Sequence, residues 1–215
     1  MKAKTLYWFV LSLSLFISSC SRAEESAADT ITSPQLQGDS LQGKKVLIVY
    51  LSRTKNTKSL AEIIHGKIGG DLVPLELETP YPEHYQTTVE QVAQENRTGY
   101  LPPLKTKIAD FETYDVVLVG FPTWGMQLPP PIKSFLKQHN LAGKTIIPFN
   151  TNAGYGIGSS FETVSQLCPD SKVLKGYTTK GGIERDGIFF VMEGEKVKRV
   201  EQEVQQWLTS IALLK

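Results

Sequence analysis

Residues 46–57 read VLIVYLSRTKNT, and this stretch decides how the chain is expected to fold. Its first part, Val46 to Leu51, is an unbroken apolar run rich in β-branched side chains. Such a run is typical of a strand buried on both faces of a parallel sheet. The polar residues from Ser52 to Thr57 follow at once and lead into a helical pattern. A buried strand, a polar turn and a helix in this order predict the first unit of an α/β sheet.

The same alternation continues along the rest of the chain. Apolar runs predict further strands at 116–121 and 145–149, and weaker runs predict strands at 72–77 and 173–177. Helical periodicity predicts helices at 56–68, 131–138 and 195–213. Five strands that alternate with helices predict a doubly wound parallel sheet with helices on both faces, because strand–helix–strand crossovers are right-handed.

Ligands in such sheets bind outside the carboxyl ends of the strands. The loop after the first strand comprises Ser52, Arg53, Thr54, Lys55, Asn56 and Thr57. Its hydroxyls, its amide side chain and the free N–H groups of a helix N-terminus are able to hold a phosphate without a dedicated cation. The alternative is that Ser and Thr only cap the helix.

Two further loops are expected at the same edge. One comprises Pro122, Thr123, Trp124 and Gly125, in which a tryptophan follows a strand end and is free to stack on a planar ring. The other begins Thr151, Asn152, Ala153, Gly154 and Tyr155, and its glycines allow the backbone to approach a flat ligand. The alternatives are a tryptophan packed under its loop and a glycine turn without a ligand.

Several other functions of this fold class are excluded by missing motifs. The chain has no G-x-G-x-x-G for a dinucleotide, no G-x-x-x-x-G-K-[ST] for a nucleoside triphosphate and no G-x-S-x-G for a hydrolase. A response-regulator receiver needs an acidic residue at the end of the third strand, where this chain has Gly120 and Phe121. The formal net charge of +1 gives no field that would attract nucleic acid.

The first 20 residues predict an export signal and not part of the fold. Lys2 and Lys4 precede an apolar run that ends in Ile17-Ser18-Ser19-Cys20, a pattern that resembles a bacterial lipobox with Cys20 as the lipidated residue. An ordinary cleaved signal or a buried apolar helix is the alternative. Residues 21–43 are polar and aperiodic, which predicts a flexible tether, and residues 44–215 form the expected domain. The other cysteine, Cys168, is expected to be a packed core thiol.

The three loops together resemble those of flavodoxins. The similarity is strongest to bacterial flavodoxin-like proteins that carry a Ser-Arg-Thr-Gly-Asn-Thr loop and a helical insertion after strand two, here around residues 81–99. The resemblance implies the strand order 2-1-3-4-5 and FMN as the cofactor. It implies that Ser52, Thr54, Asn56 and Thr57 bind the phosphate, that Trp124 stacks on the flavin with the Gly125 peptide facing N5, and that Asn152, Ala153 and Gly154 edge the ring with Tyr155 as a second stacking group. Lys55 stands where the family pattern has glycine, at a position that favours a positive φ.

Three functions remain open at this point. The first is an FMN-binding electron-transfer protein of the cell envelope, exported and held at a membrane by its lipid, whose partner is a redox protein or a small electron acceptor. The second is an FMN-dependent reductase of quinones or nitro compounds, with the insertion residues Tyr81, His84, Tyr85 and Tyr100 as the roof of a substrate pocket. The third is an interaction lipoprotein on the same scaffold that binds no flavin, which only Lys55 supports.

Overall fold

The computed structural model describes residues 43–214, and the predicted signal, almost all of the predicted tether and Cys20 lie outside this part of the chain. The strands are β1 (Val46–Tyr50), β2 (Asp71–Pro74), β3 (Val116–Pro122), β4 (Thr145–Asn152), β5 (Lys172–Val173) and β6 (Tyr177–Lys180). They form one sheet of order β2-β1-β3-β4-β5, in which β6 also pairs with β4 and every pairing is parallel. The predicted sheet and its order are confirmed.

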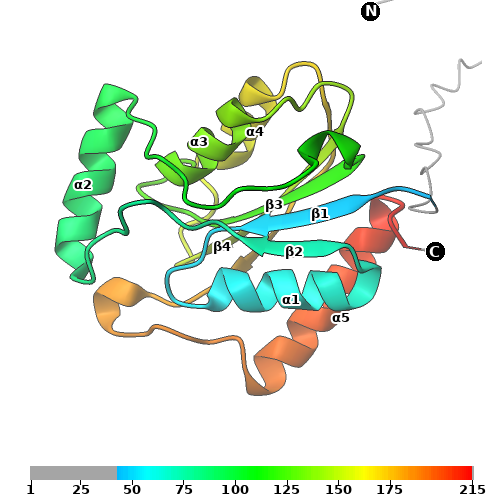
Figure 1. Ribbon diagram of the computed structural model, residues 1–215. Helices are drawn as coiled ribbons and strands as arrows, with labels where there is room; N and C mark the ends of the chain where they lie inside the picture. The colour runs from blue at the N-terminus through cyan, green and yellow to red at the C-terminus, as the bar shows by residue number, and fades with distance from the viewer. Residues whose placement is uncertain (1–42, 215) are drawn as a thin grey trace, which may run out of the picture. The chain divides into compact units, whose positions relative to one another are not determined.

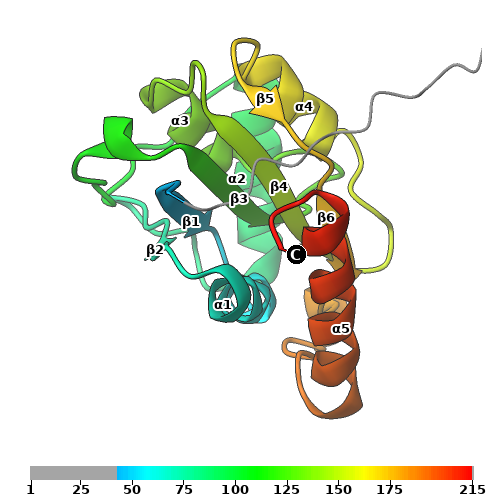
Figure 2. The same cartoon turned by 90° about the vertical axis from the view of Figure 1, so that its right-hand side faces the viewer.

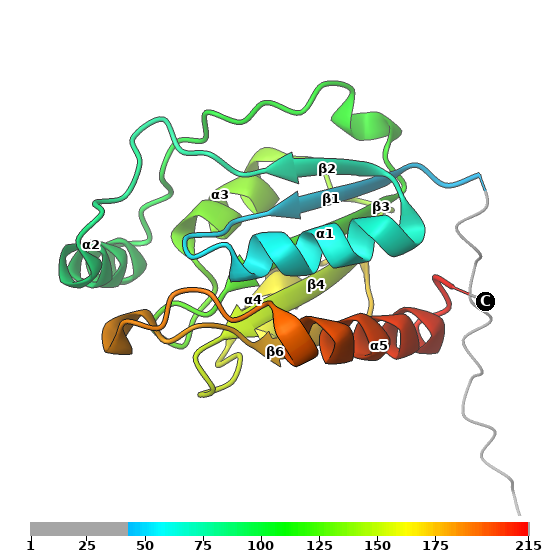
Figure 3. The ribbon, with the colours of Figure 1, turned by 90° about the horizontal axis from the view of Figure 1, so that it is seen from below.

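Helices cover both faces of this sheet, and alternate residues of each strand explain why. Leu47 and Val49 of β1 belong to the core under α3 (Pro130–Gln138) and α4 (Ser160–Leu167), whereas Ile48 packs on the opposite side. That opposite side is covered by α1 (Asn56–Ile68) and α5 (Gly194–Ser210), which lie side by side in Figure 3. Because both faces of the central strands are buried, their sequences are continuously apolar.

The fifth strand differs from the prediction, which placed it at 173–177 as one segment. It is interrupted between β5 and β6, which follow one another along β4 in Figure 2. Ile146 of β4 accepts a hydrogen bond from the N–H of Leu174, and Asn152 accepts one from Gly181, so the even-numbered residues of β4 face this strand. Pro148 is therefore the residue that would donate to it, and proline has no N–H. The break falls beside the missing donor.

Two helices complete the fold. The predicted insertion contains α2 (Tyr85–Thr98), which stands beyond the carboxyl ends of the strands in Figure 1. Helix α4 has no clear signal in the sequence, because its eight residues bury only Ser160 and Val164 and are too few to show a period. Short 3-10 turns lie at Phe111–Thr113 and Glu184–Asp186.

Cys168 is buried and unpaired, as predicted, and burial raises the pKa of its thiol to about 11. Within residues 43–214 no helix is both long enough and apolar enough to cross a membrane. The described residues also contain no cluster of three or more His, Cys, Asp or Glu that could hold a metal ion.

Gly120 is expected to be essential for packing at the carboxyl end of β3. A Cβ added there would lie 2.2–2.9 Å from atoms of the Phe149 ring, which is fully buried. We expect Gly120→Ala to lower the free energy of unfolding by about 1–3 kcal/mol through overpacking, as measured by urea denaturation. Gly66→Ala is the control: it adds its Cβ to open space within α1 and should stabilise the protein by roughly 0.5–1 kcal/mol. Equal effects of the two substitutions would contradict this account.

Candidate functional site

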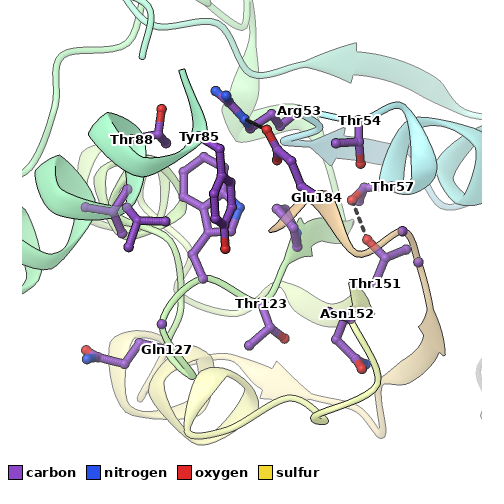
Figure 4. Close-up of a pocket in the computed structure, with 18 of the residues that line it drawn as sticks. Arg53, Thr54, Thr57, Tyr85, Thr88, Thr123, Gln127, Thr151, Asn152 and Glu184 are labelled. Carbon is purple, nitrogen blue, oxygen red and sulfur yellow. Dashed lines mark hydrogen bonds and ion pairs between the residues drawn. The ribbon is translucent and has the colours of Figure 1, made fainter. Parts of the chain in front are cut away.

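A pocket of about 440 Å³ opens at the carboxyl edge of the sheet, and this volume lies within the range of small-ligand sites. It brings together residues from all three predicted loops, namely Arg53, Thr54, Asn56, Thr57, Pro122, Thr123, Trp124, Gly125, Thr151, Asn152 and Ala153. Of the other residues predicted for the site, Ser52, Lys55, Gly154 and Tyr155 do not line it. Figure 4 shows how the labelled side chains converge.

The start of α1 offers backbone donors to this pocket. Lys55 is the residue that precedes the helix and has a φ of 64°, so the predicted positive φ is confirmed, and its side chain points to solvent. Ser52 Oγ accepts a hydrogen bond from the N–H of Lys58 at 3.2 Å. Among the described residues, none accepts a hydrogen bond from the backbone N–H groups between Thr54 and Thr57. A helix start with free N–H groups favours an anion.

Hydroxyl and amide side chains hold this loop to its neighbours. The Thr57 and Thr151 hydroxyls, both buried, lie 2.8 Å apart and join the first loop to the end of β4. Asn56 Nδ2 donates to the Phe189 carbonyl at 2.6 Å, and Asn56 Oδ1 accepts from the N–H of Val191 at 3.0 Å. The Asn56 side chain therefore anchors the segment between β6 and α5, and Asn56 also lines the pocket.

Arg53 joins two segments that flank the pocket. Its Nε lies 2.7 Å from Glu184 Oε1, and its terminal nitrogens donate to the Pro82 carbonyl at 2.9 Å and to the Glu83 carbonyl at 2.5 Å. Only 19% of the Arg53 side chain is exposed. The guanidinium thus links the loop before α2 to the segment after β6. The sequence did not suggest this linking role.

Trp124 is presented by a tight turn. Its carbonyl accepts from the N–H of Gln127 at 3.0 Å, and the two residues between them, Gly125 and Met126, have φ values of 56° and 58°. Two consecutive positive φ values define a type I′ turn. The indole is half-buried: it lines the pocket, and it also packs against the core and against the edge of Tyr81, with ring centroids 5.3 Å apart.

The third loop is organised by Asn152. Its Oδ1 accepts hydrogen bonds from the N–H groups of Gly154 at 2.8 Å and Gly156 at 3.2 Å, which leaves Ala153 against the pocket. Tyr155 is 66% exposed, and its hydroxyl accepts a hydrogen bond from Arg185 at 3.3 Å. Tyr155 therefore lies at the rim of the site.

The sequence analysis missed two walls of the pocket. One is α2 with the turn residue Gln127, and the other follows β6; the missed residues are Tyr85, Thr88, Val89, Val92, Ala93, Asn96, Arg97, Gln127, Gly181, Gly182 and Glu184, although Tyr85 was considered as part of a roof. Gly181-Gly182 follows a strand's carboxyl end, so the rule that identified the other loops could have found this pair. No local signal marks the α2 wall. The other three roof candidates, Tyr81, His84 and Tyr100, do not line the pocket.

The flavodoxin family model matches residues 45–194 of the chain. A flavodoxin from Nostoc sp. (strain PCC 7120) is 24% identical over 151 residues, which are 68% of this chain and 74% of the relative. The structure of a candidate flavoprotein from Bacteroides eggerthii DSM 20697 covers 80% of this chain and 99% of its own, at 29% identity and a TM-score of 0.64. A flavoprotein from Lactobacillus acidophilus NCFM, solved in complex with FMN, shares the fold at 24% identity and a TM-score of 0.57, covering 63% of this chain and 93% of its own.

Proposed function

The chain belongs to the flavodoxin family, and on this premise we propose that it binds FMN in the pocket at the carboxyl edge and transfers electrons. The observation that carries the proposal is the convergence of two complementary features in one pocket. The residues at the start of α1, whose backbone N–H groups have no acceptor among the described residues, line it on one side, and the half-buried Trp124 also lines it.

The residues present fit the chemistry of FMN. A phosphate needs donors without bulk, and the loop supplies backbone N–H groups together with the Thr54 and Thr57 hydroxyls. A tricyclic ring needs an apolar face and backbone edges, which Trp124, Gly125 and Ala153 supply. No cation is required within reach of the phosphate, and Arg53 is engaged elsewhere.

The chain's residues bind and orient the cofactor, while the flavin when bound supplies one- and two-electron chemistry. The Thr57–Thr151 contact fixes the distance between the phosphate loop and the third loop. The type I′ turn fixes the backbone that carries Trp124. The α2 side chains Val89, Val92 and Ala93 exclude water from the wall opposite the sheet.

The proposed partner is a redox protein or a small acceptor that meets an apolar rim. The exposed large apolar side chains of the described residues are Tyr85, Val89, Tyr100, Met126, Tyr155, Ile188, Phe189 and Phe190, and most lie on α2 or on the loops around the pocket. In the 181–193 segment, Glu184 pairs with Arg53, and Arg185 pairs with Asp186. When the predicted signal with Lys2 and Lys4 is left out, the chain has 21 basic and 22 acidic residues, so its net charge is close to zero. Contact with this partner would therefore depend on apolar surface and tethering more than on a long-range field.

Titration of the purified protein with FMN tests the binding proposal. Bound FMN should show shifted visible absorption and quenched fluorescence, because an indole stacked on the ring quenches it. Riboflavin, which lacks the phosphate, should bind more weakly. Absence of any spectral change at millimolar FMN would end the proposal.

A reductase of quinones or nitro compounds is the second candidate, and the α2 wall favours it. Tyr85, Val89, Val92 and Ala93 give the pocket an apolar side on which a flat acceptor could lie. Steady oxidation of NADH or NADPH by the FMN-loaded protein in the presence of a quinone would support the enzyme. Reduction of the flavin by an added donor without turnover would support the carrier.

The envelope location rests on the lipobox-like sequence that ends at Cys20. We expect the chain expressed in a bacterium to incorporate radiolabelled palmitate and to partition with membranes. Cys20→Ser should abolish both, because a lipid thioether needs the cysteine sulfur. Palmitate incorporation by Cys20→Ser equal to that of the wild type would refute the anchor.

Lys55→Gly tests whether Lys55 prevents FMN binding, as the third function, an interaction protein without flavin, requires. Because Lys55 already has the left-handed φ and an exposed side chain, we expect the FMN dissociation constant to change by less than about threefold. Relief of left-handed strain, about 1–2 kcal/mol, is largely offset by the extra freedom of glycine in the unfolded chain. Lys58→Gly, within α1, is the control and should cost about 1 kcal/mol of stability. If only Lys55→Gly binds FMN, the scaffold interpretation is correct.

A further inference from the structure

Helix α2 is held to the domain mainly by polar contacts. Its buried residues are Thr88, Val92 and Glu95, so Val92 is the one buried apolar side chain of its fourteen residues. Thr88 Oγ1 donates to the Pro82 carbonyl at 2.7 Å, and Lys133 of α3 donates to Asn96 at 2.8 Å. A helix seated in this way depends on each polar contact more than a helix with an apolar face does.

Glu95 contributes a buried carboxylate to these contacts. Glu95 is only 5% exposed, and each of its two carboxylate oxygens accepts a hydrogen bond. Oε1 accepts from Gln91 Nε2 at 2.9 Å, and Oε2 accepts from the Tyr81 hydroxyl. A buried carboxylate is costly unless it is hydrogen-bonded, so this arrangement fixes where Tyr81 lies. Burial, followed by the bond to Glu95, raises the pKa of the Tyr81 phenol.

Tyr81 in turn contacts the indole of Trp124. The two rings are 5.3 Å apart at an interplanar angle of 88°, which is the edge-to-face geometry that aromatic pairs favour. The Trp124 backbone is set by its own turn, but rotation of the side chain is limited by what lies beside it. Tyr81 and Trp124 both line a second cavity, together with Leu51, Leu75 and Leu77 among others, so removal of the Tyr81 ring would enlarge the space beside the indole.

We propose that Tyr81 is a positioning residue that sets the angle of the Trp124 indole, and that Glu95 links this angle to the seating of α2. This inference rests on the proposed FMN site, because the indole face in question is the one offered to the flavin. Loss of the Tyr81 ring allows the indole to turn toward the second cavity. Loss of Glu95 has the same effect at a distance, through Tyr81.

The test reads the indole directly in the protein without cofactor. The full chain has three tryptophans, so 5-fluorotryptophan labelling gives three ¹⁹F signals, and Trp124→Phe identifies the one at issue. We expect Tyr81→Leu to shift or broaden this signal and Glu95→Leu to do so as well. In the double variant of Tyr81→Leu and Glu95→Leu, the signal should shift no further than in Tyr81→Leu alone. If the two substitutions acted independently, their shifts would add. Tyr81→Phe keeps the ring but loses the hydroxyl that donates to Glu95, so it should move the signal less than Tyr81→Leu and about as much as Glu95→Leu.

Two controls and one ligand measurement complete the experiment. Tyr100→Leu makes the same change at an exposed tyrosine just after α2 and should leave the signal unchanged. Thr88→Val loosens α2 without removing the contacts of Tyr81; if it moves the signal as much as Glu95→Leu, general loosening explains the effect and the proposal fails. FMN affinity should fall roughly 2- to 10-fold in Tyr81→Leu.

Each outcome separates this inference from the proposed function. An unchanged Trp124 signal in Tyr81→Leu overturns the positioning role even if FMN binds normally. Failure of every variant and of the wild type to bind FMN overturns the proposed function, while the fluorine signals still report on the indole. Should Tyr81→Leu fail to fold, Tyr81→Phe and Glu95→Leu with their double variant still give the coupling.

Discussion

Thr54→Asp should weaken FMN binding at least 100-fold and at the same time stabilise the protein without FMN. The new carboxylate would lie among unpaired N–H groups at the start of α1, where a negative charge is favoured by roughly 0.3–1 kcal/mol. It would accept hydrogen bonds from the N–H groups that the phosphate needs, and it would repel the phosphate dianion. A loss of about 2.7 kcal/mol in binding corresponds to the 100-fold change. Isothermal titration measures the affinity, and urea denaturation measures the stability.

Two comparisons make this result specific to the phosphate. Riboflavin carries no phosphate, so its affinity should change only a few-fold in Thr54→Asp. Thr54→Val has nearly the same shape without the charge and should cost FMN only the contribution of one hydroxyl, about 0.5–1.5 kcal/mol. If Thr54→Asp binds FMN within threefold of the wild type, the phosphate does not lie at this loop.

Trp124→Ala is the second substitution with a large expected effect. It removes the aromatic face of the pocket and its contact with Tyr81, so both the stacking and the wall that supports it are lost. Aromatic stacking contributes about 0.5–1.5 kcal/mol beyond burial, and the lost apolar contact adds a similar amount. We expect about a 30-fold rise in the FMN dissociation constant and partial recovery of flavin fluorescence.

The controls for Trp124 separate stacking from general damage to the site. Trp124→Phe keeps an aromatic face and should bind FMN within about fivefold of the wild type. Tyr155→Ala removes the other aromatic residue predicted to stack, but Tyr155 is exposed and does not line the pocket, so its loss should have little effect. A larger loss of affinity in Tyr155→Ala than in Trp124→Ala would reverse the assignment of the two residues.

Local patterns were sufficient to predict most of the sheet and the three loops. The central strands β1, β3 and β4 are buried on both faces, so their apolar runs located them, although β4 continues to Asn152, beyond the predicted end at residue 149. Helix α1 begins and ends at the predicted residues because its apolar stripe is regular. The fifth strand was placed with less success, since its break depends on Pro148 in the neighbouring strand, 25 residues or more away in sequence.

The side-chain roles within the site were harder to predict than the loops. Arg53, Asn56 and Thr57 were all assigned to the phosphate loop, and all line the pocket. Yet the Arg53 and Asn56 side chains hold segments 29 to 135 residues distant, which no local pattern could indicate. Partners of this kind are chosen by packing after the chain has folded, and a polar side chain at a loop has many partners that are equally plausible in sequence.

The sequence by itself determined the fold class, the strand order implied by family resemblance and the edge at which the site lies, because these depend on periodicity and on the residues next to each strand. Only the tertiary structure decided that α2 and the Gly181-Gly182 segment close the pocket, and that Glu95 reaches Trp124 through Tyr81. The physical reason is that α2 has little apolar surface to mark its docking face. Its position follows from hydrogen bonds such as that of Lys133 with Asn96, 37 residues apart, and that of Arg53 with the Pro82 carbonyl, 29 residues apart.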